Sequence, residues 1–282
     1  MEKRTYLLVV PPDTLPETFL LFSQSIPSNN LGFVSSTSTT IDIDIGNRTF
    51  TITQSPSLLN STRSEGTTGA VLWQITPLIA SWLASHPSFL TTHAILTPAS
   101  TIIELGCGIS GLIGLTLAPF VSNYILTDLP YIRKLLQQNI DANPPIPSKS
   151  RSRPRLSSPS HPIFIPLDWE TTSSSSLLPH LPTHPSSPSS ISLIIICDCV
   201  YNEHLIPPLI STITDICSLR PPDSHPTYAL IAQQLRSDSV FEAFLTALIE
   251  KLDVWRVSDD ELSEEMREGG GYVVHIACLK TD

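Results

Sequence analysis

The sequence predicts an α/β fold built around a doubly wound, mostly parallel β-sheet. From residue 100 onward, short apolar runs alternate with helical segments, a pattern typical of parallel strands joined by right-handed crossovers. The first apolar run, 101–105, leads through a glycine-rich loop into a helix expected at 111–119. Polar residues follow the ends of several strands, which is where open α/β sheets bind their ligands.

The sheet is expected to have seven strands. Apolar runs bounded by turn residues place five parallel strands and a closing pair, at 101–105, 122–127, 162–168, 191–198, 227–234, 253–258 and 272–280. The helices expected between the strands lie at 111–119, 130–141, 204–219 and 238–252.

Residues 1–65 are expected to form a small N-terminal extension. After one possible strand at 5–10, the chain is rich in Pro, Ser and Thr. Apolar and polar residues then alternate over 41–45 and again over 49–53, on either side of a short turn that contains Gly46. This pattern predicts a β-hairpin.

Residues 66–282 are expected to form the main domain, beginning with a helix from Val71 to Ser85. Hydrophobic residues make up 41% of the 282-residue chain, which is enough for a sizeable core. Two stretches of this domain, 144–160 and 171–190, are dominated by Pro and Ser. Such segments bury too little apolar surface to order themselves, so we expect flexible insertions on either side of the third strand.

Charge and cysteine content exclude several classes of function. A net charge of −10 argues against binding to a nucleic-acid backbone and suits a basic protein partner. No apolar run approaches the roughly 20 residues that span a bilayer, and no secretion signal is recognised. The five cysteines lack metal-ligand spacing, so no metal site is expected. These features predict a cytoplasmic monomer without membrane contact, with the nucleus as the alternative compartment.

The glycine-rich loop predicts a nucleotide-like ligand, because Gly106, Gly108 and Gly111 allow a sharp turn and close approach of a ligand. Two ligand classes use such loops: a dinucleotide, whose pyrophosphate lies at the helix N-terminus, and S-adenosylmethionine. Asp128 at the end of the next strand could bind the ribose of either ligand. Glu104 favours S-adenosylmethionine, because a carboxylate repels a pyrophosphate and attracts an ammonium group.

Two further strands end in residues that suit a ligand site. Asp168 and Trp169 supply a carboxylate and an indole where an adenine would lie, although a turn cap and a packed Trp are the simpler interpretation. Asp198 and Tyr201 follow a buried strand and can face the same cavity mouth; a helix N-cap with a covering Tyr is the alternative. His204 is a general base by type alone and is left out of the predicted site.

Taken in order, Glu104-Leu-Gly-Cys-Gly, Asp128, Asp168-Trp169 and Asp198-Cys-Val-Tyr resemble the motifs of the seven-stranded, Rossmann-like (class I) S-adenosylmethionine-dependent protein-lysine methyltransferases. The resemblance covers about residues 66 to 280 and is strongest to the fungal ribosomal lysine N-methyltransferases. It implies catalytic roles for Asp198 and Tyr201, and no metal. It also implies cofactor contacts at Trp73, Gly106, Cys107, Gly108, Asp128, Trp169 and Cys197.

The function that the resemblance implies is methylation of a lysine in a large-subunit ribosomal protein of the L1 type. Asp198, Tyr201 and the acidic balance of the chain favour lysine as the methyl acceptor. Two alternatives stay open: methylation of a small-molecule or nucleic-acid nitrogen, and a catalytically silent module that binds the cofactor and regulates a partner. One departure from the family pattern is Glu170, where relatives usually have glycine.

Overall fold

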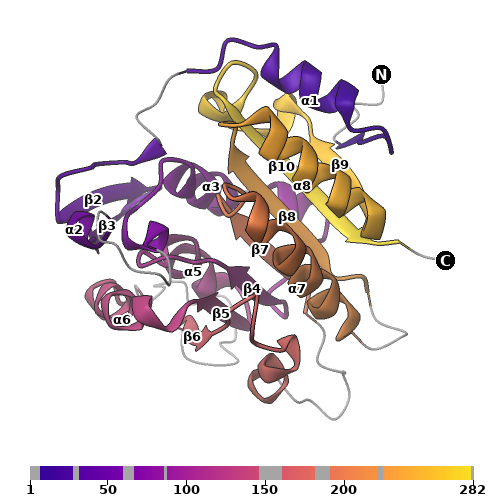
Figure 1. Cartoon of the computed structure of the whole chain (residues 1–282). Helices are drawn as coiled ribbons and strands as arrows, with labels where there is room; N and C mark the ends of the chain where they lie inside the picture. Colours follow the sequence, from indigo (N-terminus) through magenta and orange to yellow (C-terminus); the bar gives the residue numbers. More distant parts are fainter. Residues whose placement is uncertain are drawn as a thin grey trace.

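The computed structural model describes residues 7–27, 32–59, 67–85, 88–145, 161–181, 191–220 and 225–280. Its centre is an eight-stranded sheet of order β1-β9-β10-β8-β7-β4-β5-β6 (Figure 1). The seven predicted strands are all present: β4 (Thr101–Leu105), β5 (Asn123–Asp128), β6 (Ile163–Pro166), β7 (Leu193–Cys197), β8 (Tyr228–Gln234), β9 (Leu252–Val257) and β10 (Tyr272–Leu279).

Strands β4 to β8 run parallel, and the antiparallel pair β9 and β10 completes the sheet beside β8. The chain passes from β4 outward to β5 and β6, and then returns to lay β7 on the opposite side of β4. The strand order therefore reverses at β4. A crevice is expected beyond the carboxyl ends of the strands at such a reversal.

Helices cover both faces of the sheet, as the doubly wound prediction requires (Figure 1). Consecutive strand residues point to opposite faces, so Ile102 joins one apolar core and Ile103 joins the other. The first core contains residues of α3 (Ile75–Ala84), α5 (Leu112–Leu117) and α6 (Arg133–Ala142). The second contains residues of α1 (Leu15–Phe22), α7 (Ile206–Ser218) and α8 (Asp238–Lys251).

The N-terminal segment joins the main sheet. Strand β1 (Leu7–Val9) pairs antiparallel with β9 and becomes its edge strand. Helix α1 was not expected in this Pro-rich region. It forms with Pro16 in its first turn, where a missing N–H costs nothing, and buries Leu21 in the core shared with α8.

The predicted β-hairpin is confirmed as β2 (Thr40–Ile45) and β3 (Arg48–Thr53), which form a separate two-stranded sheet. Asn139 on α6 holds it to the domain. The Asn139 side chain accepts a hydrogen bond from Thr53 N at 2.8 Å and donates one to Thr53 O at 2.8 Å. Short helices α2 (Pro56–Leu59) and α4 (Phe89–Thr92) complete the α-helical elements of the described chain.

The helix predicted from Val71 begins later, at Ile75, after a short 3-10 turn at Thr68–Ala70. The backbone just before Ile75 forms hydrogen bonds with other segments of the chain. Leu72 N donates to Gln54 Oε1 at 2.9 Å, and Leu72 O accepts from Val34 N at 3.0 Å. These tertiary hydrogen bonds hold 71–74 in an irregular conformation that the local sequence pattern did not reveal.

One predicted flexible insertion is partly ordered. Residues Ser174–His180 form a 3-10 helix, η5, in which Leu177 is 0% exposed and packs in the core beside α7. Leu181 is buried in the same core. Two apolar anchors therefore order this Ser-rich stretch. The rest of the two predicted insertions, 146–160 and 182–190, lies outside the described residues.

A buried ion pair fastens α1 to the sheet. Glu17 Oε1 lies 3.1 Å from Arg256 Nε on β9 and 4.0 Å from Nε2 of His275 on β10. His275 is 0% exposed, and burial, with a smaller effect of the Arg256 charge, lowers its pKa to about 3. Burial raises the pKa of Glu17, partly opposed by Arg256. His275 is therefore neutral at physiological pH, and Glu17 and Arg256 form the charged pair.

We expect Glu17→Ala to destabilise the fold by about 3 kcal/mol, because breaking a buried pair leaves the Arg256 charge uncompensated. Chemical denaturation at pH 7.5 would measure the loss. Glu250→Ala, which removes an exposed carboxylate from α8, is the matched control and should change the free energy of unfolding by less than about 0.5 kcal/mol. Equal losses in the two variants would contradict a stabilising role for the pair.

Candidate active site

A cavity of about 1170 Å³ lies at the strand-order reversal, beyond the carboxyl ends of β4, β5 and β7. Loops after these strands and after β6 and β8 line it, together with parts of the segments 33–36 and 67–76. The structure brings every residue of the predicted site to this cavity: Trp73, Glu104, Gly106, Cys107, Gly108, Asp128, Trp169, Cys197, Asp198 and Tyr201.

The glycine loop after β4 folds back against β5. Gly106 N and Cys107 N both donate to Thr127 O, at 2.9 and 3.0 Å. Gly106 has a φ of +70°, and a Cβ there would lie 2.6 Å from Cys199 Sγ. Only glycine therefore fits this turn, which leaves the backbone open to a ligand on the cavity side.

Glu104 is a buried carboxyl group in the cavity wall, only 2% exposed. Its Oε2 accepts a hydrogen bond from the Tyr124 hydroxyl at 2.6 Å. Burial raises the pKa of Glu104 to about 8; the Tyr124 bond lowers it and the nearby charge of Asp128 raises it further. Without a bound cation, Glu104 is therefore mostly protonated at neutral pH.

Asp128 ends β5 and is oriented by backbone N–H groups. Its Oδ2 accepts from Gly108 N at 2.8 Å, and its Oδ1 accepts from Leu129 N at 2.6 Å. Burial raises the pKa of Asp128 to about 6, and these two hydrogen bonds oppose the rise. The carboxylate is thus fixed beside the glycine loop, in the position from which it can bind a ribose hydroxyl.

Trp169 lies over Gly106: a Cβ on that glycine would be 3.4 Å from the indole ring. The preceding Asp168 caps the turn, accepting from Glu170 N at 3.0 Å and from the Thr171 hydroxyl at 2.8 Å. Asp168 therefore follows the simpler of its two interpretations from sequence, in which it caps a turn. The indole Nε1 of Trp169 is buried without a hydrogen-bond partner among the described residues, so it can donate to a ligand in the cavity.

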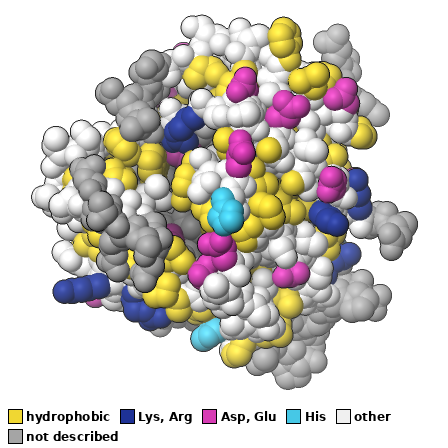
Figure 2. All heavy atoms as spheres, viewed as in Figure 1, with side chains coloured by type: hydrophobic (Ala, Val, Ile, Leu, Met, Phe, Trp, Pro, Cys, Tyr) yellow, Lys and Arg dark blue, Asp and Glu magenta, His cyan; other side chains and the backbone are white. Residues whose placement is uncertain are grey.

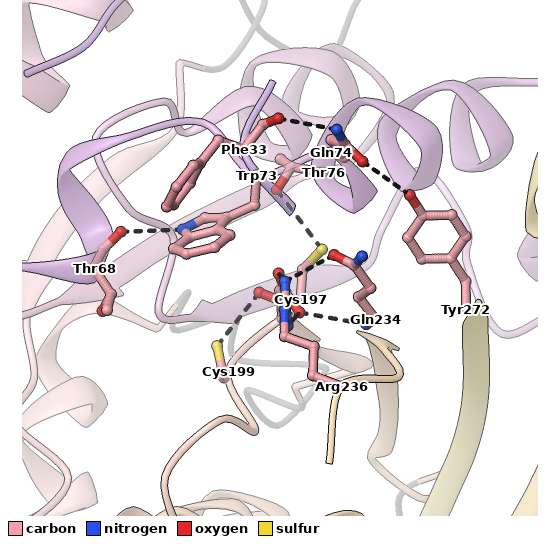
Figure 3. Close-up of polar contacts among 11 residues, drawn as sticks. Phe33, Thr68, Trp73, Gln74, Thr76, Cys197, Cys199, Gln234, Arg236 and Tyr272 are labelled. Atoms are coloured by element: carbon pink, nitrogen blue, oxygen red, sulfur yellow. Dashed lines mark hydrogen bonds and ion pairs between the residues drawn. The ribbon is translucent and has the colours of Figure 1, made fainter. Parts of the chain in front are cut away.

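Trp73 forms a second aromatic wall (Figure 3). Its Nε1 donates to Thr68 O at 3.0 Å, and its ring centroid lies 4.9 Å from that of Phe33. The Arg236 guanidinium carbon lies 5.3 Å from the Trp73 ring centroid, within cation–π range. Phe33 comes from the N-terminal extension, which therefore contributes directly to the cavity.

Asp198 follows β7 with a φ of +59°, a conformation that few residues other than glycine adopt. Its side chain is 2% exposed and binds Arg236 through two parallel hydrogen bonds, each 2.7 Å long. Gln234 N also donates to Asp198 Oδ1, at 3.3 Å. Asp198 is therefore a charge-paired and rigidly held carboxylate.

Tyr201 lies at the cavity mouth and is 44% exposed. Its hydroxyl lies 3.0 Å from Thr68 Oγ1, across the opening. Burial raises its pKa, so the phenol is protonated at physiological pH. Nearby, His204 Nε2 lies 3.4 Å from Glu170 Oε1 at the exposed rim, and both residues line the cavity.

The cavity cysteines are free thiols. Burial raises the pKa values of Cys107, Cys197 and Cys199 well above the usual range, so all three are protonated. Cys199 Sγ donates to Leu105 O at 3.3 Å, a structural contact. The described part of the chain contains no group of three His, Cys, Asp or Glu residues suited to a metal, and no helix there is long and apolar enough to cross a membrane.

Sequence reasoning missed Arg236 and Phe33. The buried strand β8 ends in Gln233 and Gln234, and Arg236 follows two residues later. The rule that polar residues at strand ends form the site could therefore have identified Arg236. No local signal marks Phe33. It reaches the cavity through an isolated bridge to Trp73, which is a tertiary contact.

Comparison with known proteins finds a family model and several relatives that are named as lysine methyltransferases. A model of the lysine methyltransferase family matches residues 53–250. Ribosomal lysine N-methyltransferase 5 of Zygosaccharomyces rouxii is 30% identical over 230 residues, covering 71% of this chain and 70% of that protein. The protein of the same name from Lachancea thermotolerans is 28% identical over 264 residues, with 76% and 78% covered.

A Schizosaccharomyces pombe protein named diaminohydroxyphosphoribosylamino-pyrimidine deaminase is 29% identical over 249 residues. The match covers 88% of this chain but 54% of that protein, so this chain spans about half the length of that relative.

The family match includes strands β4 to β8 and every predicted site residue. The free Trp169 N–H, the glycine loop and the Asp128 carboxylate suit an adenosine, and the buried Glu104 suits the cationic end of S-adenosylmethionine. The described residues of the cavity therefore fit S-adenosylmethionine, the predicted cofactor. The chain belongs to the lysine methyltransferase family.

Proposed function

We propose that this chain methylates the Nζ atom of a lysine in a basic protein, specifically a large-subunit ribosomal protein of the L1 type, in the cytoplasm. The observation that carries the proposal is the position of Asp198 and Tyr201, which both follow β7 within four residues and both line the cavity, with Tyr201 exposed at its mouth. Two relatives whose names specify ribosomal lysine methylation support the choice of substrate.

Four groups are proposed to hold the cofactor. Asp128 binds the ribose hydroxyls, and Trp169 covers the adenine and donates its free N–H to it. Gly106 and Gly108 let the cofactor lie against the backbone. Glu104 faces the cationic amino-acid end, and a positive charge there favours its carboxylate form. Trp73 and Cys197 complete the wall around the methyl group.

S-adenosylmethionine supplies an activated methyl group, so the protein has to align the acceptor and present it without a proton. The lysine nitrogen lone pair forms the new N–C bond. The C–S bond breaks with its electron pair, which leaves a neutral thioether. A free lysine has a pKa of about 10.4, so its ammonium must release a proton to solvent water before transfer. Burial and the sulfonium charge both favour that loss.

Asp198 and Tyr201 are proposed to position the lysine. Tyr201 is exposed on one side and bonded to Thr68 on the other, so its ring forms one wall of a channel for a long aliphatic side chain. Asp198 lines the same cavity and is proposed to accept a hydrogen bond from the amine at the end of that channel. Because both of its oxygens already accept from Arg236, Asp198 orients the amine and does not act as a free general base.

The charge around the cavity suits a basic substrate. Of the described residues that line it, those with carboxyl groups are Glu104, Asp128, Asp168, Glu170 and Asp198. Figure 2 shows Asp and Glu side chains above and below a His side chain near the middle of the face that it presents. Glu104 is mostly protonated and Asp198 is paired with Arg236, so the attraction for a Lys- and Arg-rich protein comes from the other carboxylates, among which Glu170 is exposed at the rim.

The proposal predicts that one lysine methylation on a large-subunit ribosomal protein of the L1 type disappears when the gene is deleted. Mass spectrometry of ribosomal proteins from deletion and parent cells would measure it, and a plasmid copy carrying Tyr201→Ala should not restore the modification. If that protein kept all its methylated lysines while another protein or a non-protein fraction lost methyl groups, the substrate assignment would be wrong.

Cofactor binding and methyl transfer are expected to depend on different residues of the cavity. Asp128→Ala should weaken S-adenosylmethionine binding by about 1.5–3 kcal/mol, the range for hydrogen bonds to a charged group. Tyr201→Ala should keep the dissociation constant within a few-fold and lose most methyl transfer, because it lies on the substrate side. Calorimetry and a radiolabelled transfer assay would measure the two properties. Equally weak cofactor binding in both variants would contradict the assigned roles.

Cofactor affinity is expected to rise with pH between about 6 and 8. The pKa of Glu104 is raised to about 8, so below that value binding of the cationic cofactor requires release of a proton. Glu104→Gln should bind more weakly at pH 8 and show a flatter pH dependence over this range. In the cofactor-free protein the same substitution should raise stability at pH 8, because the buried carboxyl group resists ionisation. Calorimetry and thermal unfolding at pH 6, 7 and 8 would test both.

A further inference from the structure

Arg236 has a special place in the charge balance of the cavity. Among the described residues that line it, Arg236 is the only one with a permanent positive charge, against five carboxyl groups. His204 is the other basic group, and it lies at the exposed rim beside Glu170. The guanidinium of Arg236 is directed at Asp198, which is three residues before Tyr201 and is the cavity-lining carboxylate closest in sequence to it.

The position of Arg236 is fixed from several sides. Its two terminal nitrogens bind the two oxygens of Asp198 at 2.7 Å, and Nη2 also donates to Gln234 Oε1 at 2.9 Å. Trp73 covers its face at 5.3 Å (Figure 3). A Cβ on Gly32 would lie 2.6 Å from Nη2, so the N-terminal segment lies against one side of the guanidinium, and 26% of the Arg236 side chain stays exposed. The guanidinium is therefore held in one orientation.

This pairing has a consequence for the substrate. An unpaired carboxylate in the lysine channel, with a side chain only 2% exposed, would bind the lysine ammonium and hold its proton. Methyl transfer needs the nitrogen lone pair, so such binding would oppose the reaction. A guanidinium paired with that carboxylate removes its net charge while leaving one acceptor direction on Oδ2 for an N–H of a neutral amine.

We infer that Arg236 is a positioning residue that neutralises Asp198, so that the substrate lysine is accepted as the neutral amine and not trapped as the ammonium. This inference rests on the proposed lysine methylation. It assigns Arg236 a role in choosing the protonation state of the substrate, in addition to holding Asp198 in its left-handed conformation.

Other titratable groups around this pair do not change the expected direction. Cys197, Cys199 and Tyr201 have pKa values raised first by burial and stay neutral. Glu104 and Asp128, on β4 and β5, titrate near pH 8 and 6. Asp168, Glu170 and His204 lie on the loops after β6 and β7. All of these groups are shared by wild type and Arg236 variants, so the difference between two pH profiles isolates the charge of Arg236.

The first test uses n-butylamine as a probe for the lysine side chain, with protein saturated by S-adenosylhomocysteine. Nuclear magnetic resonance titrations between pH 6 and 10 give its affinity. In wild type, affinity should rise with pH, because the neutral amine is preferred. In Arg236→Met, the ammonium should bind Asp198, so affinity at pH 7 should increase at least about ten-fold, the effect of one unit of pKa change. Asp198→Asn combined with Arg236→Met should abolish the increase.

The second test is methyl transfer to large ribosomal subunits from deletion cells. Arg236→Met should lower kcat at pH 7.5 at least about ten-fold and leave KM equal or lower. In this variant, the pH at which kcat falls on the acid side of the pH–rate profile should rise by about one to three units. Activity should therefore recover at alkaline pH. Arg236→Lys keeps the charge and should keep the wild-type limb. Arg133→Met, which removes an Arg stacked at 5.0 Å on Phe164 outside the cavity, is the matched control.

Identical n-butylamine profiles in wild type and Arg236→Met, with transfer reduced equally at every pH, would overturn the inference and leave Arg236 with a structural role. Arg236→Gln, whose amide can still donate to Asp198, provides a second neutral variant if Arg236→Met fails to fold. If the amine profiles differ as expected while wild type methylates no ribosomal lysine, the proposed substrate is wrong and the inference about Arg236 stands.

Discussion

The parallel pairing of β4 with β5 on one side and β7 on the other is the constraint on which the site depends. Leu105 lies opposite Thr127 on β5 and Ile196 on β7, so the three strands end at the same level. The glycine loop, Asp128 and Asp198 all follow within a few residues of that level. A shift of one strand by a single residue would turn its side chains to the opposite face and separate these groups.

The same arrangement forces carboxyl groups into a buried cavity, and the structure stabilises each in a different way. Glu104 is largely protonated and bonded to the Tyr124 hydroxyl, which leaves it ready to ionise beside a cation. Asp128 accepts from two backbone N–H groups. Asp198 is paired with Arg236. These differences match the proposed partners: a cationic group, a neutral ribose and a neutral amine.

The N-terminal segment has a larger part in this arrangement than its composition suggests. Phe33 packs on Trp73, and Gly32 lies against Arg236, so the segment supports the part of the cavity wall that Trp73 and Arg236 form. The ion pair between Glu17 and Arg256 anchors the segment to the far edge of the sheet.

The sequence by itself determined the succession of the seven main strands and the helices between them, the glycine loop and the residues at four strand ends. These features are local: hydrophobic periodicity sets the elements, and chain direction sets which end of a parallel strand faces the cavity. Only the tertiary structure decided that Asp198 is paired with Arg236, that Phe33 reaches Trp73 and that the helix expected at Val71 begins at Ile75. Each of these depends on contacts between segments far apart in the chain, where no spacing or period of the sequence carries the information.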